Sequence, residues 1–130
     1  MKTIFLIDDD EVTNFINKRI IKLNLPDVEI HVAANATEAI QRIKQRNADN
    51  LPAFDAIMID ISMPDMDGWE FMDLMETDEF YFTNQTSFFM LTSSVFEDDL
   101  NRSKTKKLIR SFFSKPLDAN KVQEIAAAIL

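Results

Sequence analysis

The sequence contains no cysteine, and this absence excludes several kinds of site. A chain without cysteine has no disulfide framework, no thiolate metal site and no cysteine nucleophile. It also contains a single histidine, His31, so a zinc site built from several histidines is excluded. Any chemistry in this protein therefore rests mainly on its carboxylates, hydroxyls and lysines.

Basic residues are scarce relative to acidic ones. The chain has 14 Lys and Arg against 22 Asp and Glu, which gives a net charge of -8 and a pI of about 4.5. Binding to a phosphate backbone needs a basic face. We therefore expect no direct nucleic-acid partner.

Long apolar runs are also absent. Nowhere do about 18 apolar residues follow one another, which is the length that a membrane-spanning helix needs. The opening "MKTIFLID" has too short an apolar run for a signal peptide. We therefore expect a protein that is not inserted in a membrane and stays in the cytoplasm.

The size and composition are those of one globular domain. The chain has 130 residues, of which 46% are apolar and 28% charged. We expect a single domain over residues 1–130, with no output domain after it.

Short apolar segments alternate with amphipathic ones along the chain. Strands are predicted at residues 3–7, 28–33, 54–59, 87–91 and 108–113, and helices at residues 12–23, 37–46, 69–75, 96–107 and 122–129. Such alternation implies an α/β fold with a five-stranded parallel sheet, doubly wound as (βα)5, with helices on both faces.

Two of the predicted helices differ in how many apolar residues they offer. The first has an apolar stripe at 3-, 4- and 7-residue spacing, with the stem of Arg19 at its margin. Its members are Val12, Phe15, Ile16, Ile20 and Leu23. The fourth, at residues 96–107, offers only Phe96 and Leu100 as clear apolar anchors, so we expect it to be weakly held.

The stretch "IFLIDDDEV", residues 4–12, places adjacent carboxylates at the end of a buried strand. Two carboxylates about 4 Å apart repel by roughly 4 kcal/mol at an effective dielectric constant near 20. A cation is therefore expected beside them. Asp10 and Glu11 are more simply explained as first-turn helix residues, which the helix dipole favours.

Ligands of open parallel sheets bind outside the carboxyl ends of the strands, where the strand order reverses. The residues that follow the predicted strands at this edge are Asp8, Asp9, Asp10, Asp60, Thr92 and Lys115. Mg²⁺ is usually held by one or two carboxylates together with waters and phosphate oxygens. A hydroxyl and an ammonium group could then hold the phosphate oxygens.

Four motifs, "FLIDDD", "MIDISMPDMDG", "FFMLTSS" and "FFSKPL", occur in the order and spacing of a known family. Over essentially its whole length the chain resembles the receiver domain of two-component response regulators, which has a flavodoxin-like fold. The resemblance implies that Asp60 accepts a phosphoryl group from a sensor histidine kinase or a histidine phosphotransfer protein. It implies Mg²⁺ held directly by Asp9, Asp60 and the backbone carbonyl of Ser62, and by Asp8 through water.

The resemblance also assigns the residues that respond to phosphorylation. Thr92 matches the switch hydroxyl, Lys115 the phosphate-binding lysine and Phe112 the switch aromatic. Pro116 follows Lys115 in a bond that is usually cis in this family. Gly68, the only glycine, is expected to supply a backbone conformation that other residues resist.

A receiver of this kind is not an enzyme in the ordinary sense, because it catalyses only its own phosphorylation and slow autodephosphorylation. A downstream protein is the implied target. The expected contact for that partner is the surface formed by the fourth helix, the fifth strand and the last helix.

Two other functions compete with this interpretation. A haloacid dehalogenase-type phosphatase would use Asp8 as nucleophile with Asp10 two residues later, but that family needs an acidic pair after its lysine, and it leaves Asp60 without a role. The second alternative is a binding module that keeps the fold and signals without phosphoryl transfer. Phosphorylation of Asp60, of Asp8 or of neither distinguishes the three.

Overall fold

The computed structural model describes residues 1–93, 101–102 and 106–130. Its parallel strands are β1 (Thr3–Ile7), β2 (Glu29–Ala33), β3 (Ala56–Asp60), β4 (Ser87–Thr92) and β5 (Ile109–Ser114). They form one five-stranded sheet in the order β2-β1-β3-β4-β5. The predicted fold class is therefore confirmed. The helix predicted at residues 96–107 lies largely outside the described residues, as do its expected anchors Phe96 and Leu100.

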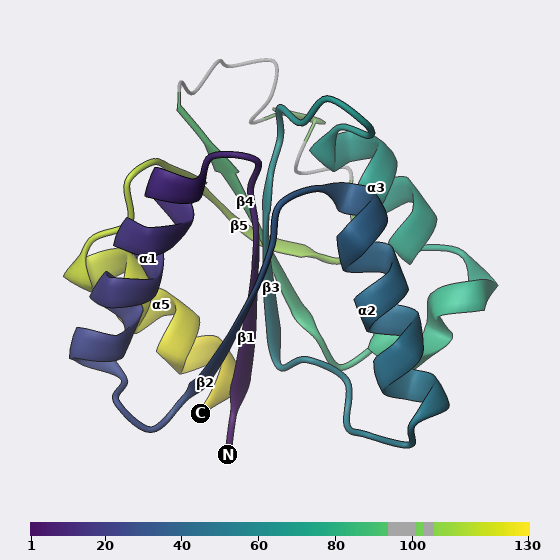
Figure 1. The fold of residues 1–130 in the computed structure, drawn as a ribbon, viewed down its shortest axis with the longest axis horizontal. Helices are drawn as coiled ribbons and strands as arrows, with labels where there is room; N and C mark the ends of the chain where they lie inside the picture. Colours follow the sequence, from purple (N-terminus) through teal and green to yellow (C-terminus); the bar gives the residue numbers. More distant parts are fainter. Residues whose placement is uncertain (94–100, 103–105) are drawn as a thin grey trace.

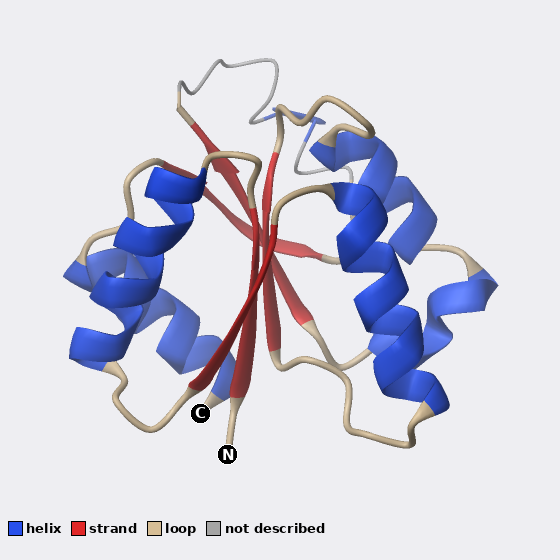
Figure 2. Cartoon of the chain, viewed as in Figure 1, coloured by secondary structure: helices blue, strands red, loops and turns tan. Residues whose placement is uncertain are grey.

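Helices cover both faces of the sheet (Figures 1 and 2). The helices α1 (Glu11–Asn24) and α5 (Ala119–Ile129) lie on one face, and α2 (Ala36–Ala48) and α3 (Gly68–Met75) on the other. A short 3-10 helix, η1 (Asp78–Thr83), follows α3 and was not predicted from the sequence. Within the described part of the chain, no helix is both long and apolar enough to cross a bilayer.

The central strands separate two apolar cores. Side chains alternate along β1, so that Phe5 and Ile7 face the core under α2 and α3, while Ile4 and Leu6 face the core under α1 and α5. Every residue of β1 and β3 is buried. This is why these strands have continuous apolar sequences rather than alternating ones.

Side-chain caps fix where the helices begin. Asp10 caps α1 by accepting hydrogen bonds from the amides of Val12 (2.9 Å) and Thr13 (3.3 Å). Asp67 and Glu70 form a capping box at the start of α3. The predicted N-terminal role of Asp10 is confirmed.

Helix α1 presents its faces differently from what its apolar stripe suggests. A stripe of this kind ordinarily faces the core. Here, however, the buried positions of α1 are Asn14, Asn17 and Ile21, whereas Phe15 is 66% exposed and Leu23 73% exposed. The periodicity predicted the helix correctly but not the face that packs on the sheet.

Gly68 is needed for space rather than for an unusual backbone conformation. Its φ is not positive, so the expected special conformation is not found. A Cβ at this position would lie 2.7 Å from Met90 Cε and 2.9 Å from the Asp60 carbonyl oxygen. The absence of a side chain lets the start of α3 pack against the end of β3.

Candidate functional site

A pocket of about 600 Å³ opens at the carboxyl ends of the strands. It lies beside β1 and β3, where the strand order reverses, which is the usual ligand position in this type of fold. Its lining residues are Asp8, Asp9, Asp10, Thr13, Ile16, Asn17, Asp60, Ser62, Ser93, Lys115 and Pro116.

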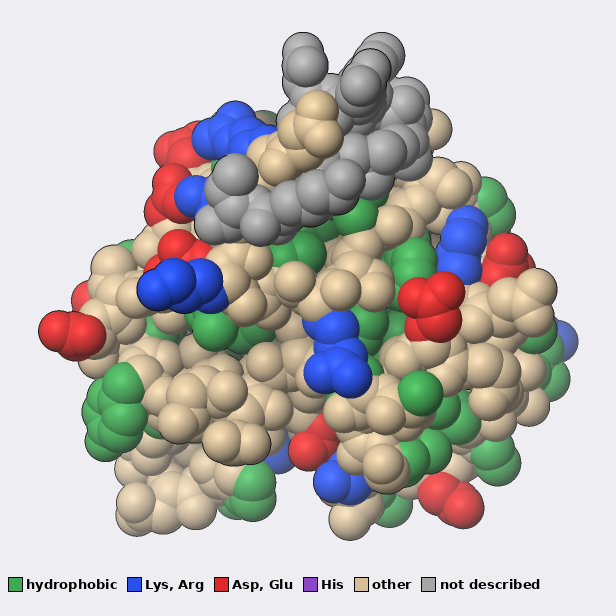
Figure 3. Space-filling view, turned by 180° about the vertical axis from the view of Figure 1, so that it is seen from behind, with side chains coloured by type: hydrophobic (Ala, Val, Ile, Leu, Met, Phe, Trp, Pro, Cys, Tyr) green, Lys and Arg blue, Asp and Glu red, His purple; other side chains and the backbone are tan. Residues whose placement is uncertain are grey.

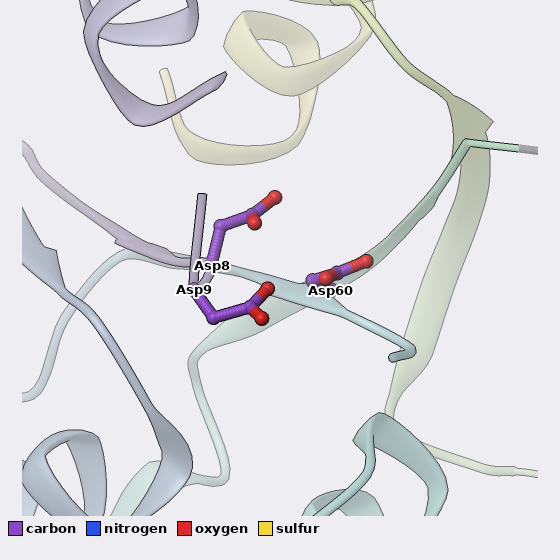
Figure 4. A group of neighbouring side chains, drawn as sticks. All are labelled: Asp8, Asp9 and Asp60. Atoms are coloured by element: carbon purple, nitrogen blue, oxygen red, sulfur yellow. The ribbon is translucent and has the colours of Figure 1, made fainter. Parts of the chain in front are cut away.

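Three aspartates meet in this pocket (Figure 4). Asp8 and Asp9 follow β1, Asp60 ends β3, and carboxylate oxygens of the three lie within 4.8 Å of one another. Asp8 and Asp60 are buried, at 1% and 4% exposure, whereas Asp9 is exposed. The arrangement leaves one carboxylate accessible from solvent and two held in the floor of the pocket.

Lys115 provides the positive charge in the pocket. Its ammonium group lies 2.6 Å from an Asp8 carboxylate oxygen and 3.1 Å from one of Asp60. The backbone also positions this residue, because the Lys115 amide donates to the carbonyl of Thr92 at 2.7 Å. The Lys115–Pro116 peptide bond is cis, as the resemblance implies.

The surroundings alter the protonation of these groups. Burial raises the pKa of Asp60 to about 6, the negative charge of Asp8 adds to this rise, and Lys115 partly opposes it. Burial alone would lower the pKa of Lys115, but its hydrogen bonds and charge interactions with Asp8 and Asp60 outweigh burial and raise it. Asp60 is therefore a buried carboxylate that is mostly ionised at neutral pH and takes up a proton at mildly acidic pH.

The donor set suits a hard divalent cation. Three carboxylates around one space carry more negative charge than the single ammonium of Lys115 neutralises. Ser62 lines the same pocket and offers a backbone carbonyl. Oxygen donors of these two kinds are those that Mg²⁺ prefers.

Two of the proposed switch residues, Thr92 and Phe112, do not line the pocket, whereas Lys115 lies among the carboxylates. Thr92 is buried at the end of β4, and Ser93 beyond it lines the pocket. Phe112 is half-buried on β5, and its ring stacks beside Trp69 of α3 with centroids 6.4 Å apart. The structure thus places Thr92 between the carboxylates and the strand that carries Phe112.

The phosphatase alternative does not fit this geometry. In that mechanism Asp10 would serve beside a nucleophilic Asp8, but the Asp10 carboxylate caps α1. Its hydrogen bonds, chiefly with Thr13, hold the pKa of Asp10 below its ordinary value. An acid with a lowered pKa at a helix N-terminus is poorly suited to donate a proton.

Among the residues that the sequence analysis did not single out are two buried asparagines of α1 beside the pocket. Asn17 lines the pocket from α1, and the side-chain amide of Asn14 donates to the carbonyl of Asp8 at 2.8 Å. Both are buried. Their spacing of three residues, which places them on one face of a helix, was the signal available in the sequence.

A family comparison identifies the chain. The model of the response regulator receiver domain matches residues 4–127. The chain belongs to this family. Receiver domains are signalling modules rather than classical enzymes, and the acidic cluster of this one is compatible with phosphorylation and Mg²⁺.

Individual relatives agree with this assignment. A two-component response regulator from Cytophaga hutchinsonii is 29% identical, with a TM-score of 0.91 over 99% of this chain and 96% of that one. A second, from Legionella pneumophila, is 25% identical, with a TM-score of 0.81 over 99% and 98% of the two chains.

A curated relative shows the same domain within a longer protein. It is the hybrid signal transduction histidine kinase L of Dictyostelium discoideum, which is 28% identical over 125 residues. The match covers 94% of this receiver chain but spans only 7% of that kinase.

Proposed function

We propose that this receiver domain accepts a phosphoryl group on Asp60 from a phosphohistidine of a sensor kinase or a histidine phosphotransfer protein. The observation that carries the proposal is the position of Asp60. Its carboxylate lies in an open pocket with two further aspartates and 3.1 Å from Lys115. The cytoplasmic location and the downstream protein partner expected from the sequence are part of the same proposal.

The transfer is a substitution at phosphorus. An Asp60 carboxylate oxygen forms a bond to phosphorus while the donor's N–P bond breaks and its electron pair returns to the imidazole nitrogen. The product is an acyl phosphate, which water later hydrolyses to regenerate the carboxylate and release phosphate. Because the pKa of Asp60 is about 6, this carboxyl is ionised, and so nucleophilic, in most molecules at neutral pH.

Charge has to be neutralised before a phosphoryl group can enter this acidic pocket. Lys115 lies where it can contact a phosphoryl oxygen on Asp60. We assign Asp9, Asp60 and the Ser62 carbonyl as direct ligands of Mg²⁺, with Asp8 acting through water. The metal would offset the carboxylate charge and that of the equatorial phosphoryl oxygens.

The phosphorylated state would be read through Thr92, Lys115 and Phe112. Modification replaces one negative charge by about -1.5 to -2 and adds strong acceptor oxygens. If Thr92 and Lys115 each gain a charge-assisted hydrogen bond worth about 1.5–3 kcal/mol, together they approach the roughly 5.5 kcal/mol that reverses a 1:99 equilibrium. Phe112 would then change its packing beside Trp69.

Intact-mass spectrometry after incubation with acetyl phosphate and Mg²⁺ tests the acceptor. The wild type is expected to gain one phosphoryl group, and Asp60→Asn none. Asp118→Asn is a matched control, because Asp118 caps α5 outside the pocket. A phosphorylated Asp60→Asn protein would overturn the assignment. If, in addition, Asp8→Asn gained no phosphoryl group, the result would favour the phosphatase. A wild type that is never modified would indicate a binding module.

The exposed stripe of α1 is the surface that we propose for the donor protein. Val12, Phe15 and Leu23 are each at least 65% exposed, and Ile16 both belongs to the stripe and lines the pocket. From Val12 to Leu23 the stripe is about 17 Å long. A partner docked there lies directly beside Asp60.

Charge indicates the chemistry of that partner. The chain is acidic overall, yet the exposed side chains of Lys18 and Arg19 flank the stripe. We therefore propose a helix whose apolar face is bordered by acidic residues, on the protein that carries the phosphohistidine.

Transfer from protein and from small-molecule donors separates docking from chemistry. Phe15→Ala and Arg19→Glu are expected to slow transfer from the most active kinase of a purified panel, while leaving acetyl phosphate labelling unchanged. Leu51→Ala removes an exposed apolar side chain away from α1 and serves as the control. Equal kinase rates for all of these variants would contradict the docking surface.

A further inference from the structure

We propose that Asn14 and Asn17 of α1 are positioning residues, which hold together the two loops that carry Asp8 and Lys115. The inference rests on the proposed function, because it concerns the geometry of the same pocket. It assigns a role to the buried face of α1, whose residues include these two asparagines and Ile21.

Asn17 fixes the loop that carries Lys115. The residue is 1% exposed, and its Oδ1 accepts a hydrogen bond from the amide of Leu117 at 3.3 Å. Leu117 lies two residues after Lys115 and is itself buried. The bond therefore ties α1 to a segment 100 residues away along the chain, next to the pocket's only described ammonium group.

Asn14 fixes the loop that carries Asp8. Its Nδ2 donates to the carbonyl of Asp8 at 2.8 Å, one helical turn before Asn17. The rest of Asp8 is held as well, since its amide donates to the carbonyl of Ala33 at 3.2 Å and its Oδ1 accepts from the amide of Asp10 at 2.9 Å.

The two bonds act on the two ends of one ion pair. Asp8 and Lys115 lie 2.6 Å apart, and each belongs to a loop that one of the asparagines binds. α1 thus links the β1–α1 loop to the β5–α5 loop. In metal sites, residues that do not touch the metal often hold its ligands in place through hydrogen bonds. Asn14 and Asn17 hold the loops of Asp8 and Lys115 in the same way.

A purely structural role explains this face poorly. Burying a polar side chain is unfavourable unless its hydrogen bonds are made. Among the described residues, Asn14 Oδ1 is buried without a hydrogen-bond partner. Meanwhile the apolar side chains of Val12 and Phe15 on the same helix are exposed. At the two buried positions from which α1 contacts the loops, the helix therefore carries asparagines instead of apolar side chains.

The matched experiment compares Asn14→Leu and Asn17→Leu with Ile21→Val. The leucine variants keep the branched arrangement of side-chain heavy atoms but, being apolar and larger, cannot make the loop hydrogen bonds, whereas Ile21→Val trims a core residue on the same face. Both leucine variants are expected to lower the rate of acetyl phosphate labelling and the calorimetric Mg²⁺ affinity by about tenfold or more. Ile21→Val should change each by less than twofold.

Two outcomes separate this inference from the function on which it rests. Wild-type protein that neither binds Mg²⁺ nor is labelled would overturn the proposed function. Wild-type protein that does both, with leucine variants matching Ile21→Val, would overturn the positioning role alone.

A measurement on the wild type covers the case in which a leucine variant fails to fold. If the hydrogen bonds of Asn14 and Asn17 favour the geometry that binds Mg²⁺, then by thermodynamic linkage bound Mg²⁺ must stabilise these hydrogen bonds. Amide hydrogen exchange at Leu117 is therefore expected to slow by about tenfold when saturating Mg²⁺ is added. The amide of Leu130, which bonds within α5, is the internal reference. Unchanged relative protection of Leu117 would contradict the proposal.

Discussion

Helices α1 and α5 lie side by side on the same face of the sheet, yet they bury different kinds of side chain (Figure 1). α5 packs Val122, Ile125 and Ile129 into the core, as its apolar spacing predicts. α1 turns two asparagines inward and most of its apolar stripe outward. An apolar stripe therefore predicts a helix, but it does not by itself decide which face of that helix packs on the sheet.

The difference follows the positions of the two helices relative to the pocket. The first turns of α1 lie against the loops that carry Asp8 and Lys115, where polar contacts are required. The buried side chains of α5 contact the apolar β-sheet core instead. We expect α5 to contribute mainly to stability and α1 mainly to function, and three measurements test that expectation.

The largest effect is expected in α5. Ile125 is fully buried, so Ile125→Ala removes apolar contacts and leaves a cavity. The free energy of unfolding should fall by about 2–5 kcal/mol, as measured by urea denaturation. Ala127→Ser, at an exposed position of the same helix, is the control. A loss below about 1 kcal/mol for Ile125→Ala would contradict the packing described for α5.

A smaller effect is expected in the pH dependence of the free energy of unfolding, because of Asp60 in the pocket. Folding raises the pKa of Asp60 from an ordinary 3.8 to about 6, so the folded protein binds a proton there more readily than the unfolded chain. This tighter proton binding adds to the free energy of unfolding. The contribution is fully present below pH 3.8 and is lost as the pH rises through about 6. Unfolding measured between pH 7.5 and 5 should show this gain in wild type.

Asp60→Asn is the control for that measurement, because it removes the titrating group. Saturating Mg²⁺ should also suppress the gain, since a cation favours the ionised carboxylate. Identical pH profiles for wild type and Asp60→Asn would show that burial does not perturb Asp60 as described.

The smallest effect on stability is expected on the outer face of α1. Phe15 is 66% exposed, and alanine is a better helix former than phenylalanine. Phe15→Ala should therefore change the free energy of unfolding by no more than about 0.5 kcal/mol. Chemical denaturation beside Ile21→Ala, which truncates a buried residue on the same helix, provides the comparison. A large loss for Phe15→Ala would mean that the stripe packs within the domain.

Basic and acidic side chains are interspersed on part of the surface. On the face opposite to that of Figure 1, basic side chains lie apart with acidic ones near them (Figure 3). Among the described residues, Lys106 pairs with Asp73 and Lys44 with Glu79. Such pairing reduces the positive potential that a phosphate backbone would require.

Much of the fold was accessible from the sequence because its signals are local. Continuous apolar segments predicted the strands, and turn residues such as those around Gly68 marked their ends. The 3-10 helix η1 was missed, since its sequence has no helical period. Only one of its adjacent aromatic residues is deeply buried: Phe80 is 1% exposed and Tyr81 74% exposed.

The sequence by itself determined the succession of the strands along the chain and the meeting of Asp8, Asp9, Asp60 and Lys115 at one edge. It could do so because the carboxyl ends of parallel strands necessarily share an edge. Only the tertiary structure decided which side of α1 faces inward and why residue 68 must lack a side chain. Helical periodicity defines the faces of a helix, but what each face contacts depends on segments distant in the chain.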